Sequence, residues 1–229
     1  PTSVRVVTAE EIQRENLISI YDIIDRTANL ASTFNRSGFT IRGISNSNVS
    51  GTGIGDLATI YLDGSPLPRD AVDNGPLDLW DLAQVEVLRG PQSTLQGRNA
   101  LAGTIVLRTA DPSFDFTGKA RAMLTATTGE RRFAAALGGP IVGEDIAFRV
   151  AGEVSRADGL VDNPTLGIDA DKARASTIHG KLLFTPSAAP GLRILLSYLR
   201  DRHRGGADYS FSDIPNYWSD RQTYGNRET

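Results

Sequence analysis

The sequence lacks cysteine, and among its 229 residues it has only two histidines, His179 and His203. Without cysteine there is no disulfide framework and no thiolate nucleophile or thiolate metal ligand. The two histidines stand outside any ligand-like cluster, so we expect no metal site and no cofactor. There is no G-x-S-x-G nucleophile elbow, and acid pairs such as Asp22 and Asp25 fall on helix starts, where capping accounts for them. These absences argue against an enzyme.

Long hydrophobic runs are absent too. No segment approaches about 18 consecutive apolar residues, so the sequence predicts no transmembrane helix. A transmembrane β-strand needs only about 9–11 alternating residues, so a membrane protein is not excluded. Pro1 is not followed by the charged and apolar regions of a signal peptide. We therefore expect a leader to have been removed or to precede this sequence.

Charge is divided unevenly along the chain. Residues 1–112 hold 9 Arg, no Lys and 13 acidic residues, a net charge of −4. Residues 113–229 hold 15 basic and 14 acidic residues, a net charge of +1. A nucleic-acid-binding domain concentrates basic residues on one face or one domain. Neither part does so, and we expect no nucleic-acid partner.

Two capping patterns near the N-terminus predict helices. Thr8 and Glu11 fit the S/T-x-x-E capping box, which predicts a helix over 9–15 after the short strand VRVVT. Ser19 with Asp22 repeats the pattern more weakly and predicts a second helix with isoleucines along one face.

Strand signals dominate the rest of the first half. Alternation and turn residues predict strands at 39–44, 59–64, 85–90 and 104–109, the first two leading into turns at Arg-Gly and Asp-Gly. LDLWDLA, at 77–83, predicts a short helical turn. The first half is therefore expected to be a small α+β domain with four or five strands.

A glycine-rich stretch at 45–56 interrupts these strands. Gly51, Gly53 and Gly55 invite comparison with a phosphate-binding loop, but no Lys-Ser/Thr follows and the next element reads as a strand. We interpret the stretch as a flexible apical loop, and 65–76, with its three prolines, as a second irregular segment.

The most informative stretch is 85–108, VEVLRGPQSTLQGRNALAGTIVLR. By itself it reads as two strands whose charges lie on solvated faces. It also resembles the end of the plug domain of TonB-dependent outer-membrane receptors, V-E-V-x-R-G-P, a glycine, then G-x-I-x-I/L. The matching residues are Val85, Glu86, Val87, Arg89, Gly90, Pro91, Gly97, Gly103, Ile105 and Leu107. An I-R-G at 41–43 and a Y-x-D-G at 61–64 extend the resemblance.

After Asp111-Pro112 the sequence alternates with period two in five segments of roughly ten residues. A soluble sandwich and a transmembrane barrel share this alternation, so alternation alone favours the two folds about equally. Short connectors at 139–145 and 185–191 and a long one at 156–175 favour a barrel, although the turn at 127–131 is tight where a longer loop is usual. Phe148 and Phe184, beside the short turns, would form an aromatic girdle.

The resemblance implies a fold and a location. We expect an α+β plug domain at 1–112, followed at 113–229 by about five antiparallel transmembrane β-barrel strands. Receptors of this kind have 22 strands, a size class whose lumen is plugged, so these strands would form an incomplete barrel. The expected location is the bacterial outer membrane, with its lipid as a partner.

The resemblance also implies a function. Such receptors import a scarce nutrient, most often an iron–siderophore complex and sometimes cobalamin or a carbohydrate, and the periplasmic protein TonB energises them. The TonB-binding motif expected upstream of VRVVTAEE is not in this sequence, so we expect this stretch alone not to couple to TonB. A ligand-sensing signalling receptor is the main alternative, and an adhesin or passive porin would not need a plug.

Site residues follow from the same motifs. Arg42, Glu86 and Arg89 match the charged plug residues that meet barrel carboxylates in the family, and we expect them to form a plug–barrel lock whose other half lies beyond Thr229. The apical stretches at 46–52 and 68–73 supply the candidate substrate contacts, unless they are only solvated turns. These candidates are Asn46, Asn48, Arg69 and Asp70.

Overall fold

The computed structural model describes residues 3–33, 38–46, 58–68, 72, 78–90, 102–126, 129–160, 162–163, 168–169 and 171–205. The chain divides into two compact units, Pro1–Ala110 and Asp111–Thr229, called here the N-terminal unit and the C-terminal unit. The expected domain boundary after residue 112 lies two residues beyond this division, and the assignment of the two domains stays a prediction.

Both predicted helices are present in the N-terminal unit. Helix α1 spans Ala9–Arg14, and the Glu11 amide donates to Thr8 Oγ1 over 3.3 Å, but the Glu11 carboxylate pairs with Arg5 at 3.0 Å instead of closing the box. Helix α2 spans Ile20–Asp25 and has the complete capping box, with Asp22 Oδ2 accepting from the Ser19 amide over 3.0 Å. The pattern that is weaker in the sequence is therefore the complete one in the structure.

The main sheet of the N-terminal unit has the order β1-β7-β8-β5-β6. All neighbours are antiparallel except β5 and β8, which are parallel. The five strands are β1 Ser3–Thr8, β5 Ala58–Leu62, β6 Ser65–Pro66, β7 Leu82–Arg89 and β8 Gly103–Thr109. The predicted pair at 85–90 and 104–109 is confirmed as β7 and β8.

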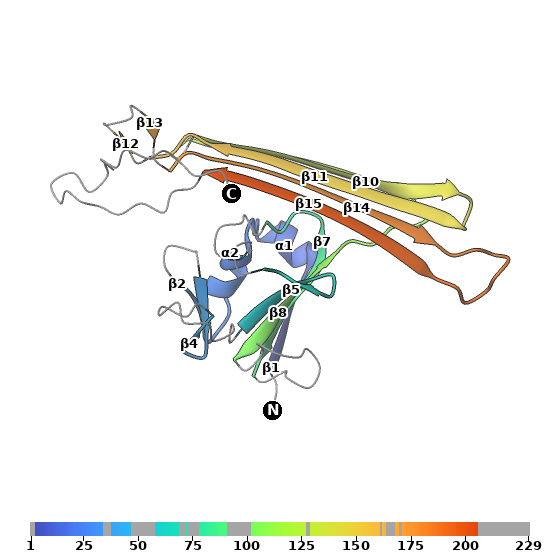
Figure 1. Cartoon of the computed structure of the whole chain (residues 1–229), viewed down its shortest axis with the longest axis horizontal. Coiled ribbons are helices and arrows are strands. Elements are labelled where there is room, and N and C mark those ends of the chain that lie inside the picture. Colours follow the sequence, from blue (N-terminus) through green and yellow to red (C-terminus); the bar gives the residue numbers. More distant parts are fainter. Residues whose placement is uncertain are drawn as a thin grey trace. The chain divides into compact units, whose positions relative to one another are not determined.

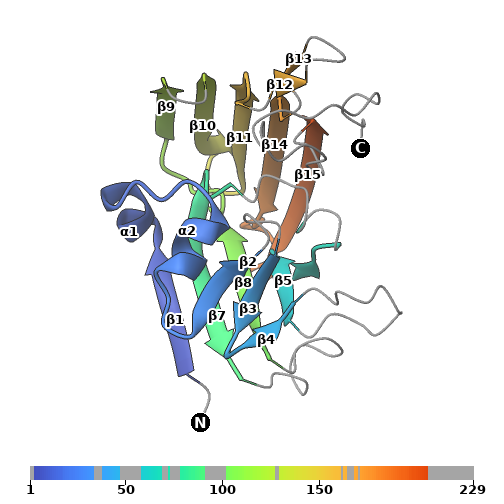
Figure 2. The same cartoon turned by 90° about the vertical axis from the view of Figure 1, so that its left-hand side faces the viewer.

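A second sheet of three strands, in the order β2-β3-β4, lies with α2 on one side of the main sheet (Figures 1 and 2). Its strands are β2 Leu30–Thr33, β3 Gly38–Ile41 and β4 Ile44–Ser45. The core of the unit fills the space between these layers, as expected for apolar faces that must be removed from water. Its fully buried side chains are Val7, Leu17, Ile20, Ile23, Ile24, Phe39, Ile41, Ile60, Val85, Val87 and Ile105.

This unit also contains two tight hairpin turns, and the segment before β7 differs from the prediction. Arg42–Gly43 (φ 53° and 79°) and Asp63–Gly64 (φ 47° and 85°) have positive φ at both residues, as a two-residue hairpin loop of type I′ requires. The helical turn predicted at 77–83 is wrong: residues 80–81 form a turn, and β7 already begins at Leu82. Asp81 takes a left-handed φ of 59°, which a helix does not contain.

The C-terminal unit contains one antiparallel sheet of five long strands in the order β15-β14-β11-β10-β9, which lie side by side in Figure 2. They are β9 Thr117–Thr125, β10 Glu130–Val142, β11 Ile146–Ala157, β14 Ala173–Phe184 and β15 Ile194–Gly205. The two-residue strands β12 Asp162–Asn163 and β13 Ile168–Asp169 pair within the long connection. All five predicted strands are confirmed, and β10 extends to Val142, so the turn before β11 is shorter than expected.

The two faces of this sheet differ in chemistry. One face carries charged and polar side chains, several of them buried, such as Arg132, Glu153 and Lys181. The other face carries large apolar side chains that stay exposed, such as Leu137 at 54 % and Leu196 at 60 %. A sandwich would bury such an apolar face beneath a second sheet. Within the described part of the chain, no helix is long and apolar enough to span a membrane.

Candidate functional site

In the N-terminal unit, Arg42 and Arg89 converge on one turn. Arg89 Nη1 donates to the carbonyl of Ala28 over 3.0 Å, and the Arg42 amide donates to the neighbouring carbonyl of Asn29 over 2.7 Å. Arg42 Nη1 also lies 3.6 Å from the position that a Cβ at Gly90 would occupy. Arg42 follows the last residue of β3, and Arg89 is the last residue of β7. The ends of these two strands therefore bring residues that are 47 positions apart to the same turn.

Glu86 lies on the opposite face of β7. Val85 and Val87 are fully buried and share their face with Arg89, so the alternation of the strand directs Glu86 the other way. Its Oε1 accepts from Gln84 Nε2 over 2.7 Å and from Arg108 Nε on β8 over 2.9 Å. Glu86 is thus paired within its own sheet, and Arg108 is the partner that the sequence motif did not point to.

The positions of Arg42, Glu86 and Arg89 constrain the geometry of the expected plug–barrel lock, but they do not test whether it forms. The structure brings Arg42 and Arg89 together and separates Glu86 from them. A lock formed by all three residues would therefore have to contact its counterpart on two faces of β7. The assignment of Arg42, Glu86 and Arg89 to a plug–barrel lock stays a prediction.

Gly103, the first residue of β8, lies where the chain packs closely against its neighbours. Its φ is 155°, and a Cβ there would collide with the carbonyl oxygen of Leu88 and lie 3.1 Å from Ile41 Cδ1. Ala102, next to it, is 2 % exposed. Neither residue has room for a larger side chain, and Gly97 of the sequence motif lies outside the described residues.

Of the four candidate substrate contacts, only Asn46 lies within the described residues. It is 6 % exposed, and its Oδ1 accepts from the Phe39 amide over 2.7 Å. In this arrangement the side chain holds the β3–β4 hairpin. Asn48, Arg69 and Asp70 lie outside the described residues, and the role of all four in substrate binding stays a prediction.

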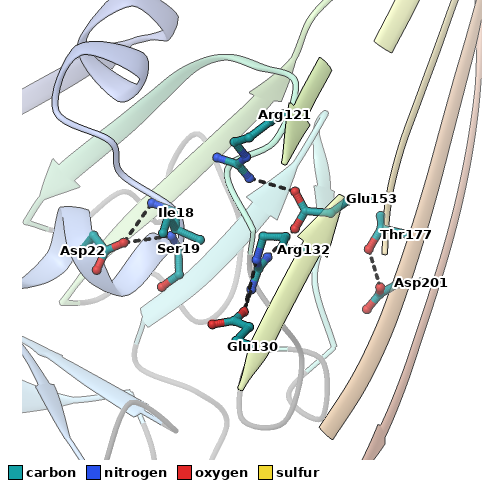
Figure 3. Close-up of polar contacts among 9 residues, drawn as sticks. All are labelled: Ile18, Ser19, Asp22, Arg121, Glu130, Arg132, Glu153, Thr177 and Asp201. Carbon is teal, nitrogen blue, oxygen red and sulfur yellow. Dashed lines mark hydrogen bonds and ion pairs between the residues drawn. The ribbon is translucent and has the colours of Figure 1, made fainter. Parts of the chain in front are cut away.

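A charged cluster lies on the polar face of the C-terminal unit (Figure 3). Glu153 on β11 is its centre: Arg121 Nη2 lies 2.8 Å from Glu153 Oε2, and Arg132 Nη1 pairs with Glu153 Oε1. Arg132 also contacts Glu130 Oε1, with Nη2 at 2.7 Å. Only 4 % of the Glu153 side chain and 9 % of the Arg132 side chain are exposed.

The strand register explains how these charges meet. Ala134 on β10 stands between Arg121 on β9 and Glu153 on β11, directly opposite both. Strands two positions apart are separated by roughly 10 Å, which the long arginine and glutamate side chains span because Ala134 leaves space above it. One strand further, Thr177 Oγ1 donates to Asp201 Oδ1 over 2.7 Å. The alternation of the sequence predicted this polar face, but not which charges would pair.

Asp111, at the start of the C-terminal unit, is held by two cations. Its Oδ1 lies 2.8 Å from Lys181 Nζ, and its Oδ2 lies 3.3 Å from Arg193 Nη2. Partial burial raises the pKa of the Asp111 carboxyl, but the hydrogen bonds and charges of Lys181 and Arg193 outweigh this effect and leave the pKa below its usual value of 3.8. The residue that begins the second unit is therefore ionised and fixed to β14 and to the residue before β15.

Within the described ranges, no group of three or more potential ligand residues could hold a metal ion. His179 is 9 % exposed on the polar face of β14. His203 lies on the same face near the end of β15. The arrangement offers charged surfaces for binding and holding a partner.

The comparisons with known proteins fit this geometry. Residues 1–104 match the family model described as TonB-dependent Receptor Plug Domain. The ferrioxamine B receptor of Salmonella typhimurium (strain SL1344) is 29 % identical over 166 residues, which cover 69 % of this chain and 22 % of that receptor. The ferrioxamine receptor of Yersinia enterocolitica is 26 % identical over 163 residues. This chain thus spans about a fifth of the length of these curated relatives.

Solved structures extend the likeness to both units. The ferric yersiniabactin uptake receptor from Yersinia pestis has a TM-score of 0.75 and 26 % identity, over 89 % of this chain and 32 % of that one. The alcaligin outer-membrane receptor from Bordetella pertussis has a TM-score of 0.70 and 19 % identity, over 90 % of this chain and 32 % of that one. At that identity the second likeness concerns the fold alone. The relatives are named as receptors and not as enzymes, in agreement with the expectation from the sequence.

Proposed function

This chain belongs to the TonB-dependent receptors of the bacterial outer membrane, and we propose that the whole protein imports an iron–siderophore complex under the control of its plug. The observation that carries the proposal is the similarity of this chain to receptors named for ferrioxamine and yersiniabactin, across both units. Cobalamin and carbohydrates, the other nutrients considered, have no counterpart among these names.

The two units support a gated pathway in different ways. The N-terminal unit has one continuous apolar core, which suits a domain that must block a lumen as one body. The C-terminal sheet has a charged face of the kind that lines a water-filled barrel and an apolar face of the kind that meets lipid. TonB is the proposed energising partner, acting through the N-terminal motif that such receptors carry.

Arg42, Glu86 and Arg89 are the proposed plug half of the lock. Charges paired across a wet interface orient two surfaces and can still separate, whereas an unpaired buried charge costs several kcal/mol. Arg42 is exposed, while Glu86 and Arg89 are only partly buried, so all three can reach an external partner. The contacts of the three residues with Ala28, Asn29 and Arg108 would fix their positions before they meet the barrel.

Uptake of labelled iron tests the proposed function. A strain that lacks its own receptors and carries the complete gene is given ⁵⁵Fe-loaded ferrioxamine B, yersiniabactin and alcaligin in iron-limited medium. Uptake of at least one chelate should depend on both the gene and TonB. Uptake of cobalamin or a carbohydrate in place of every iron chelate would overturn the proposal.

The lock has a separate test in the same strain. Arg89→Ala should change siderophore uptake and increase hydrogen exchange in β7 and β8, because the Ala28 contact and the external partner are both lost. The exposed Arg14→Ala on α1 removes an equal charge and should change neither. Unchanged uptake and unchanged plug stability in Arg89→Ala would show that the assignment is wrong.

A further inference from the structure

Four arginines form a row across the apolar face of the C-terminal sheet. Arg131 on β10 stands directly opposite Arg156 on β11, which stands opposite Arg174 on β14, which stands opposite Arg204 on β15. We call these four residues the arginine row. Neighbouring strands are about 4.8 Å apart, so the row extends over roughly 15 Å.

The arginine row lies on the apolar face and not on the charged one. In β10, Arg131 shares its parity with Phe133 and Leu137, which are 52 % and 54 % exposed. In β11, Arg156 shares its parity with the exposed Val150 and Val154. All four arginines are exposed. They therefore point away from the Glu153 cluster.

Among the residues that the structure describes, acids neutralise Arg131, Arg156 and Arg174 only in part. Arg131 Nη2 lies 3.2 Å from Asp158 Oδ2, in a pair whose side chains are 61 % and 53 % exposed. Arg156 and Arg174 have no charged partner among the residues that the structure describes. Like charges directly opposite each other in a sheet are destabilising. A row of this kind persists at lower cost when anions outside the chain neutralise it.

The position of the arginine row along the strands indicates where those anions lie. The row stands at the end of the sheet where the long connection between β11 and β14 begins, and long connections in outer-membrane barrels are extracellular. From Val154 back to Ile146, the residues of β11 on this face carry no charge. That stretch is about 27 Å long, or roughly 20 Å across a membrane at a tilt of about 40°, which approaches the ~25 Å apolar band of such barrels.

We propose that the arginine row binds the phosphate groups of anionic lipids at the extracellular rim of the apolar band. The planar guanidinium group donates two parallel hydrogen bonds to a phosphate, and several arginines in register suit a headgroup with more than one phosphate. The adjoining apolar side chains would contact the acyl chains of the same lipid. Arg200 and Arg202, on the same face of β15, extend the positive charge along that strand.

A lipid fits these observations better than an acidic protein does. A protein partner at this site would have to approach through the lipid layer that the exposed apolar face requires. A lipid headgroup occupies that depth already, and each arginine near a charged membrane surface favours binding about fivefold.

Lipid binding to the complete receptor tests the proposal. The receptor in nonionic detergent is titrated with dioleoyl phosphatidic acid and with dioleoylglycerol, which differ only in the phosphate, and bound lipid is counted by native mass spectrometry. The wild type should prefer phosphatidic acid, and Arg156→Gln/Arg174→Gln should weaken its binding about thirtyfold without changing dioleoylglycerol binding. Arg14→Gln/Arg26→Gln removes two positive charges from the N-terminal unit and should bind as the wild type does.

Two further measurements keep the proposal testable if the double variant does not fold. Arg156→Lys/Arg174→Lys retains the charge, and its affinity should fall less than about fivefold. Binding of phosphatidic acid to the wild type should weaken as salt is raised. Equal affinity of the wild type and the glutamine variant, equal binding of the two lipids, salt-independent binding, or capture of an acidic protein at the row in place of lipid would each overturn the proposal.

Discussion

The two units of this chain differ in where their large apolar and charged side chains lie. In the N-terminal unit, isoleucine, valine and phenylalanine fill a core between two sheets and a helix, and three large apolar side chains among the described residues are exposed. In the described part of the C-terminal unit seventeen such side chains are exposed, while Arg132, Glu153, His179 and Lys181 are buried. The first pattern suits a surface in water and the second suits a surface in lipid, because each surface matches its own solvent.

The largest effect should follow from damage to the N-terminal core. Phe39→Ala removes a fully buried aromatic side chain and leaves a cavity between β3 and the main sheet, which should cost about 3–5 kcal/mol. Hydrogen exchange of the amides of β7 and β8 in the complete receptor would measure the loss. Ile44→Ala, at a residue that is 41 % exposed on the same hairpin, is the control and should cost under about 0.5 kcal/mol.

The buried charges of the C-terminal unit should give the next largest effect. Glu153→Gln leaves Arg121 and Arg132 without their shared carboxylate and should destabilise the sheet by about 3 kcal/mol. The midpoint of urea unfolding in detergent micelles would report the change. Asp201→Asn, which weakens one exposed hydrogen bond with Thr177, should have a much smaller effect. An effect of Glu153→Gln as small as that expected for Asp201→Asn would mean that the Glu153 cluster adds little stability.

The smallest effect should come from Asp111. Because its pKa is lowered in the folded chain, its ion pairs stabilise the C-terminal unit at neutral pH, and this contribution is lost as the pH falls below about 3.8 toward the lowered pKa. The carboxylate is 46 % exposed, so Asp111→Asn should cost under about 1 kcal/mol at pH 7. Unfolding at pH 7 and pH 3 would test this, since the difference from the wild type should shrink at the lower pH.

Local signals in the sequence predicted much of this fold. Asp63–Gly64 and Arg42–Gly43 form the turns expected after their strands, and strict alternation placed all five strands of the C-terminal unit. Both signals depend on residues close together in the chain. They are therefore readable without knowledge of tertiary contacts.

Features that depend on distant residues could not be predicted in this way. Strand β2 has a single buried apolar residue, Leu30, and exists because β3 pairs with it. The parallel pairing of β5 with β8 joins segments about 45 residues apart, and no local pattern encodes it. Glu11 leaves its expected capping role because Arg5 lies within reach. Each case is a tertiary contact that prevails over a local preference.

In the candidate site, too, local motifs identified residues, whereas their partners depend on tertiary structure. The motif at 85–108 identified Glu86 and Arg89, but their partners, Arg108 and the Ala28 carbonyl, follow from sheet register and from a turn 61 residues away. The arginine row could not be predicted from the sequence either. Its members lie on four different strands and become neighbours only through register.

One pair of variants tests most directly whether the two units face different solvents. Val4 on β1 and Val150 on β11 are both 50 % exposed. In the complete receptor folded into lipid vesicles, Val150→Arg should lower the free energy of unfolding by about 2–4 kcal/mol, because the charge would enter the apolar band. Val4→Arg should change local stability by no more than about 0.5 kcal/mol. An equally small cost at both positions would contradict the account.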